Sequence, residues 1–187
     1  MTLHRSFSCF ACLLVFFALA GCSSVSSVHP VGRVLTGDLS EELNGSWMGS
    51  EGHQLQIRCD SDGALSFAVA EWKEDQGKFA LDTGEGVLRE IGDQIVFNYA
   101  EDEGEYAFFL IRAFDGQLIV WSPDVDEFRA LVEDESLAGR VEDDEHSTQI
   151  ILTGTSEEIT KAIENLDFSK LFEWSKPAIV LVRITGN

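Results

Sequence analysis

The sequence predicts an α+β fold: an antiparallel β-meander with two C-terminal helices packed on it and a closing C-terminal strand. Three observations predict it. Short apolar runs separated by turn-forming residues fill the middle of the chain, two amphipathic stretches with capping patterns follow, and a further apolar run comes after Pro177. At 187 residues, 44% hydrophobic and 25% charged, the chain has the length and composition of one folded domain with a short additional segment.

The first 22 residues predict export and lipid attachment. Arg5 precedes an apolar run from Phe10 to Ala20, which is shorter than the roughly 20 residues that a membrane-spanning helix needs and fits the hydrophobic region of an export signal. The run ends in Leu19-Ala20-Gly21-Cys22, which resembles the lipobox of bacterial lipoproteins. An ordinary signal peptide cut near Ala20 is the alternative.

The lipoprotein resemblance implies a domain organisation and a location. Residues 1–21 would be a signal peptide, Cys22 would carry the lipid, residues 22–37 would be a lipidated tether, and residues 38–187 would form a single globular α+β domain. Several acyl chains on one cysteine make a durable membrane anchor. Because Ser23 follows the cysteine where an Asp would favour the inner membrane, the resemblance implies an outer-membrane location facing the periplasm.

The middle of the chain is expected to form a meander. Turn-forming residues such as Asp60-Ser61-Asp62-Gly63, Asp82-Thr83-Gly84-Glu85 and Asp115-Gly116 separate the apolar runs. Short connections of this kind make consecutive strands antiparallel neighbours. The expected strands are His53–Cys59, Ala64–Trp72, Lys78–Leu81, Gly86–Ile91, Gln94–Tyr99, Glu105–Phe114 and Gln117–Ser122.

Some of these strands have informative faces. Residues 106–111 and 118–121 are apolar on both faces, so we expect another layer to cover their outer side. Residues 64–72 have large side chains on one face and small ones on the other, and the small face leaves room for a helix or a ligand. Cys59 shares a face with Leu55 and is expected to be a buried structural thiol rather than a nucleophile.

Helix-start patterns define the C-terminal third. Ser122 or Asp124 caps the first helix, and Glu127 completes a capping box with Asp124. Thr155 and Glu158 form the second capping box. The apolar stripes that follow are expected to pack on the sheet. Two further strands complete the prediction, at Thr148–Leu152 and Ala178–Ile184.

A short motif precedes the first strand of the meander. Gly45-Ser46-Trp47 resembles the Gly-x-Trp signature of lipocalins. In that family the Trp closes one end of an eight-stranded barrel and a late basic residue packs across it, a part that Arg183 would take here, so Trp47 and Arg183 are the expected barrel-closing pair. Because two helices and two strands follow the meander, where lipocalins have one helix and one short strand, we expect a curled sheet or partial, lipocalin-like barrel.

Composition and motifs argue against several function classes. With 13 Lys and Arg against 33 Asp and Glu, the net charge of −20 argues against nucleic-acid binding. The histidines at 29, 53 and 146 are scattered, and no paired Cys/His spacing exists, so we expect no metal and no cofactor. No nucleophile or phosphate-binding motif is present, and we expect no catalytic residues and no enzymatic activity. The acids concentrate at residues 101–105 and 142–145.

These observations favour a non-enzymatic binding module of the cell envelope. A small apolar ligand would require a cavity of several hundred Å³, whereas a basic protein partner would require an exposed apolar patch rimmed by acids. An inhibitor of a basic envelope enzyme such as a lysozyme fits the charge, and a carboxylate-based hydrolase is the alternative from another class. The identity of the ligand or partner, the oligomeric state, and calcium binding by the acidic loops stay open.

Overall fold

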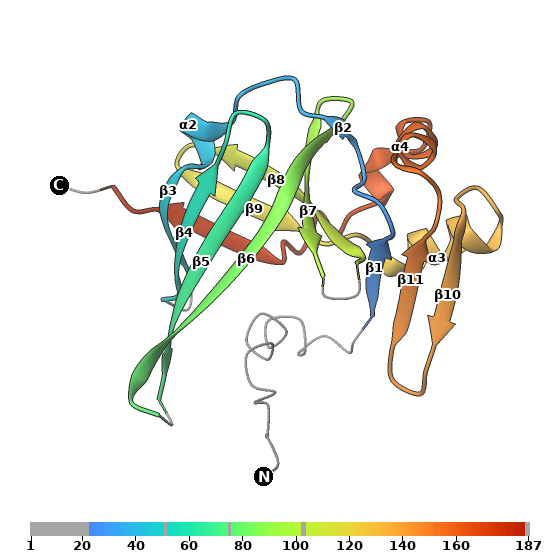
Figure 1. The fold of residues 1–187 in the computed structure, drawn as a ribbon. Helices are drawn as coiled ribbons and strands as arrows, with labels where there is room; N and C mark the ends of the chain where they lie inside the picture. Colours follow the sequence, from blue (N-terminus) through green and yellow to red (C-terminus); the bar gives the residue numbers. More distant parts are fainter. Residues whose placement is uncertain (1–22, 51, 75, 102–103, 186–187) are drawn as a thin grey trace, which may run out of the picture.

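The computed structural model describes residues 23–185, apart from residues 51, 75, 102 and 103 (Figure 1). Within this part the chain is mostly antiparallel β-structure with short helices. The lipobox and Cys22 lie outside the described residues, so the expected lipid attachment stays a prediction.

The central feature is a closed barrel of eight antiparallel strands, in place of the curled sheet or partial barrel that we expected. The strands pair in chain order from β3 to β9, and β12 closes the ring by pairing with β3 on one side and β9 on the other. Each strand of the ring therefore has a neighbour on both sides, although among the described residues positions 78–85 of β6 pair only with β5. They are β3 (Gly45–Gly49), β4 (Gln54–Cys59), β5 (Ala64–Lys73), β6 (Lys78–Ile91), β7 (Gln94–Ala100), β8 (Tyr106–Phe114), β9 (Gln117–Trp121) and β12 (Ile179–Arg183).

One turn expected from the sequence does not exist. Residues 82–85 lie inside β6, which pairs with β5 continuously from Lys78 to Val87. The glycines there make room for aromatic rings instead of reversing the chain. A Cβ on Gly84 would lie 2.4 Å from a ring carbon of Phe67, and one on Gly86 would lie 2.5 Å from a ring carbon of Phe97.

A second layer lies against the outer side of the barrel. One edge of β8 has two partners: its C-terminal part pairs with β9, and its first residues pair with β1 (Ser24–Ser27). On its other side β1 pairs in parallel with β11 (Thr148–Leu152), and β11 pairs with β10 (Gly139–Asp143). The helices α3 (Val125–Glu133) and α4 (Ser156–Glu164) and the short η1 (Phe168–Lys170) complete this layer. Figure 1 shows α3, α4, β10 and β11 gathered on the β1 side of the barrel.

This layer confirms that the strands with two apolar faces are covered. Phe108 and Leu110 on the outer side of β8 are at most 1% exposed and belong to a core with Phe128 of α3 and Ile159 of α4. The predicted capping box at the start of α4 forms, whereas the one predicted between Asp124 and Glu127 forms only in part, because the Asp124 amide donates to the carbonyl of Leu171 instead of to Glu127. Asp124 accepts hydrogen bonds from the first turn of α3, and the second capping box forms reciprocally at the start of α4.

Residues 24–35 are packed into the fold, so the expectation of a free tether is wrong for them. Val31 is fully buried, and both of its backbone groups bind the buried side chain of Asn98: the Val31 amide donates to Oδ1 at 2.6 Å, and Nδ2 donates to the carbonyl at 3.0 Å. The amide of Gly32 donates to Oγ1 of Thr160 at 3.0 Å, and β2 (Arg33–Val34) pairs with β6. Apolar burial and satisfied backbone groups therefore fix a segment whose composition resembled a linker.

Candidate functional site

The interior of the barrel has a packed end and an open end. At the packed end, inward side chains such as Leu43, Trp47 and Leu88 are at most 2% exposed. Toward the other end the barrel encloses a cavity of about 420 Å³. The β3–β4 loop lies at this open end, because β3 ends there and β4 begins there. The β5–β6 hairpin lies at the same end, because the start of β4 pairs with the last part of β5.

The two residues that the lipocalin resemblance indicated, Trp47 and Arg183, lie together at the packed end. The indole Nε1 of Trp47 donates to the carbonyl of Leu43 in α2 (Ser40–Leu43) at 2.9 Å. The guanidinium of Arg183 lies 4.5 Å from the centre of the Trp47 ring, a cation–π geometry, and donates to the carbonyls of Asn44 and Glu42. The structure thus brings Trp47 and Arg183 together and ties β12 to the segment before β3.

The cavity walls are almost entirely apolar. The walls consist of inward-facing side chains of the barrel strands. Because successive side chains of a strand point to opposite faces, alternate residues along a strand face the interior. On β5 the large face points inward, so the small-residue face of residues 64–70, which we expected to receive a ligand or a helix, lies on the outside. The walls include Leu55, Ile57, Leu65, Phe67, Val69, Phe97, Phe109, Ile111, Leu118, Val120, Ile179 and Leu181.

Three aromatic rings form one side of the cavity. Phe67 of β5 lies 6.2 Å from Phe97 and 6.0 Å from Tyr99, measured between ring centres, and the two β7 rings are 6.4 Å apart. Rings of this cluster cover Gly84 and Gly86 of β6. Sequence analysis did not connect these residues, because the rings and the glycines come from three different strands.

Polar groups gather at the open end of the cavity. Glu71 forms an ion pair with Lys73 at 2.5 Å, and its other oxygen lies 3.9 Å from Nε2 of His53. Asp82 also lines the cavity, and within the described part of the chain it has no hydrogen bond and no ion pair. The alternation that placed Phe67 and Val69 on one face of β5 also places Glu71 there, so a carboxylate on the inner wall was visible in the sequence.

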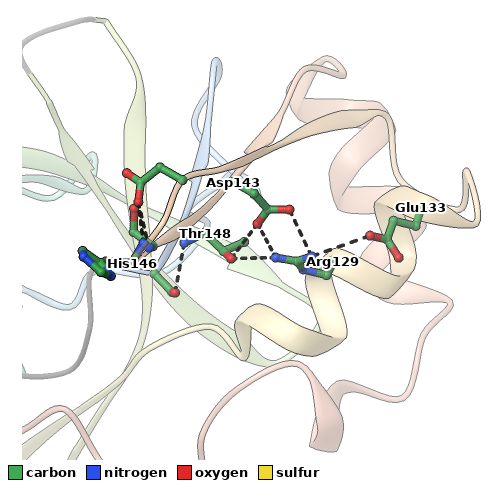
Figure 2. A network of polar contacts seen from close by, with 8 residues as sticks. Arg129, Glu133, Asp143, His146 and Thr148 are labelled. Carbon is green, nitrogen blue, oxygen red and sulfur yellow. Dashed lines mark hydrogen bonds and ion pairs between the residues drawn. The ribbon is translucent and has the colours of Figure 1, made fainter.

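The acidic cluster at residues 142–145 is partly structural (Figure 2). Arg129 of α3 binds the carboxylate of Asp143 through both terminal nitrogens and donates to Oγ1 of Thr148 at 2.6 Å. Hydrogen bonds from Thr148 and Arg129 hold the pKa of Asp143 below its usual value. Asp144 accepts from the backbone amide of His146 at 2.8 Å, which orders the β10–β11 turn. His146 therefore contributes its backbone to this network rather than its imidazole.

The remaining candidates from the sequence have ordinary structural environments. Cys59 is 2% exposed, which confirms the buried thiol, and burial raises its pKa, with a further contribution from Asp38. Residues 60–63 form the β4–β5 turn, in which Asp62 accepts a hydrogen bond from the Ala64 amide. Among the described residues, no group of three or more His, Cys, Asp or Glu side chains is arranged to hold a metal ion.

No protein-family model, no curated protein and no solved structure matches this chain. No helix in the part of the chain that the structure describes is long and apolar enough to cross a membrane. The geometry of the barrel therefore carries the functional argument.

Proposed function

We propose that this chain is an envelope lipoprotein, anchored at Cys22, whose barrel binds a small apolar ligand. The observation that carries the proposal is the cavity of about 420 Å³ with its apolar walls. Small-molecule sites are typically clefts or cavities of about 300–1,000 Å³ lined by hydrophobic and aromatic side chains. A module that binds only proteins would be expected to have a filled interior.

The expected affinity follows from the apolar area that the cavity can bury. A ligand with about 12 methylenes gains roughly 10 kcal/mol at about 0.8 kcal/mol each. Association consumes at least about 4 kcal/mol of this gain. The balance of about 6 kcal/mol corresponds to a Kd of about 40 μM.

The position of Cys22 in the sequence, directly before Ser23, supports an exchange role at a membrane. The backbone amide of Thr148 donates to Oγ of Ser23 at 3.1 Å, and β1 begins at the next residue. An extended residue spans only about 3.5 Å. A lipid on Cys22 would therefore hold the barrel close to the bilayer, where an apolar ligand could move between the membrane and the cavity.

A second function, binding of a protein partner, is favoured by one specific surface. Trp72, Phe79 and Leu81 are 50%, 69% and 67% exposed on the outer face of the β5–β6 hairpin. The rings of Trp72 and Phe79 lie 5.1 Å apart, and Figure 1 shows this hairpin protruding beyond the rest of the barrel. A basic partner, such as a lysozyme, would complement the net charge of −20.

Native mass spectrometry of the chain from Ser23 onward, exported behind a cleavable signal, tests the proposal. This length retains both hydrophobic cores, because the first core residue is Val25. We expect an excess mass that disappears on denaturation, or saturable uptake of added 1-dodecanol. A bare mass together with no uptake of dodecanol would exclude the ligand-binding function, and cross-linking in envelope extracts would then test the partner function.

A further inference from the structure

We propose that the ligand of the barrel carries an ammonium group, which binds between Asp82 and the ring cluster of Phe67, Phe97 and Tyr99. This inference rests on the proposed function and specifies the chemical class of the ligand: an apolar chain with a cationic head. Three features of the inner wall support it, namely a carboxylate without a partner, a neighbouring aromatic cluster and a negative open end.

Asp82 is the first feature. It is half-buried on the inner face of β6, opposite Val69 of β5, and lines the cavity at its open end. Within the described residues no donor binds its carboxylate. Removing a carboxylate from water without a partner is costly, so buried charges in proteins are normally paired. A cation on the ligand would supply the missing partner.

The aromatic cluster is the second feature. Phe67 and Tyr99 cover Gly84, which is the next inward-facing position of β6 after Asp82. The faces of aromatic rings attract cations, and quaternary ammonium groups are commonly bound in cages of aromatic rings. The wall therefore presents a ring cluster and a carboxylate within one step of the strand.

The third feature is the sign of the charge at the open end. Glu71 lies diagonally across the β5–β6 pair from Asp82, at a spacing of roughly 7–8 Å between backbones. Glu71 already has the cation of Lys73 at 2.5 Å, whereas Asp82 has no such partner. The net charge of the chain is also strongly negative, at −20. Such a field attracts cations and repels a ligand with a carboxylate head.

Three probes with the same apolar chain test the inference: dodecyltrimethylammonium, 1-dodecanol and dodecanoate, each below its aggregation concentration. Calorimetric titration of the chain from Ser23 onward should show that the ammonium probe binds at least tenfold more tightly than the alcohol, and dodecanoate most weakly. Asp82→Asn should reduce the preference for the ammonium probe over the alcohol to less than twofold. The matched control is Glu85→Gln, an exposed position on the outer face of the same strand, which should keep the preference.

Each contrary outcome has a distinct meaning. Equal affinities for the ammonium and alcohol probes, or a preference that survives in Asp82→Asn, would overturn the inference while leaving the apolar-ligand function intact. No binding of any probe would overturn the proposed function itself. If Asp82→Asn fails to fold, NMR of the wild-type complex with dodecyltrimethylammonium tests the site instead. We expect nuclear Overhauser contacts between the trimethylammonium protons and ring protons of Phe67 or Tyr99. Contacts only with water-exposed residues would refute the site.

Discussion

Filling the cavity should weaken ligand binding strongly without unfolding the barrel. Val69 lies on the inner wall of β5, and Ala68 is its neighbour on the outer face of the same strand. Val69→Trp adds about seven non-hydrogen atoms inside the cavity. These atoms take the place of ligand methylenes whose burial contributes up to about 5 kcal/mol to binding. Because the ligand can shift within the cavity, we expect about half of that loss, or roughly 2–3 kcal/mol, which weakens binding about 30- to 150-fold.

Thermal unfolding in the presence of 1-dodecanol measures this effect. At a ligand concentration of about 100 times its Kd, binding stabilises the native state by about 2.7 kcal/mol. For a chain of this size that corresponds to an increase in Tm of about 5–10 °C. Val69→Trp should lose roughly 70–90% of this increase, and Ala68→Trp should keep it. The same increase in both variants would show that the alcohol binds outside the barrel and would refute the reasoning.

Three further predictions test the rest of the structure. Asn98→Ala leaves two buried backbone groups without partners and should lower the free energy of unfolding in urea by about 2–5 kcal/mol. The control Asn165→Ala, at an exposed helix end, should lower it by no more than about 0.5 kcal/mol. Equal losses of stability in the two variants would contradict the docking of the N-terminal segment. Hydrogen bonds from Thr155 lower the pKa of Glu158, so its contribution to stability is present above the ordinary glutamate value of 4.5 and is lost as the pH falls through the lowered value. The Tm of Glu158→Gln should therefore be lower than that of the wild type at neutral pH and approach it on acidification, and a pH-independent difference would argue against this account. Burial raises the pKa of the Cys59 thiol, so a thiol reagent should label it only as the protein unfolds, and rapid labelling of native protein would contradict its burial.

Local patterns in the sequence predicted most of the elements correctly. The alternation around Cys59, the capping box at Thr155 and the doubly apolar strands near Phe108 all have the environments that we expected. Each of these features depends on residues a few positions apart, and such short-range rules are well reflected in sequence.

The errors concern contacts between distant segments. The turn composition of residues 82–85 hid a continuous strand, because the rings that need Gly84 come from β5 and β7. Residues 24–27 looked like a tether, because their parallel partner β11 is more than 100 residues away. Barrel closure depends on β12, whose apolar sequence fits an edge strand and a closing strand equally well. The cavity follows from that closure, so its volume had no signature in the sequence.

The same limit applies to the candidate site. The pairing of Trp47 with Arg183 was indicated by a resemblance, but the position of Asp82 depends on the register of β6 with β5. A shift of one residue in that register would move its carboxylate to the outside of the barrel. Sequence alone assigned Asp82 to a turn and could not distinguish it from the other acids.

Methyl-resolved NMR during titration with 1-dodecanol would locate the apolar ligand, which we propose binds inside the barrel. Saturable shifts should appear for Leu55, Val69 and Val120, which line the cavity. The methyl groups of Ile150, buried in the other core, and Val182, exposed on the outer face of β12, should not change. Shifts confined to Val182 and other outer residues would place the ligand on the surface and contradict the account.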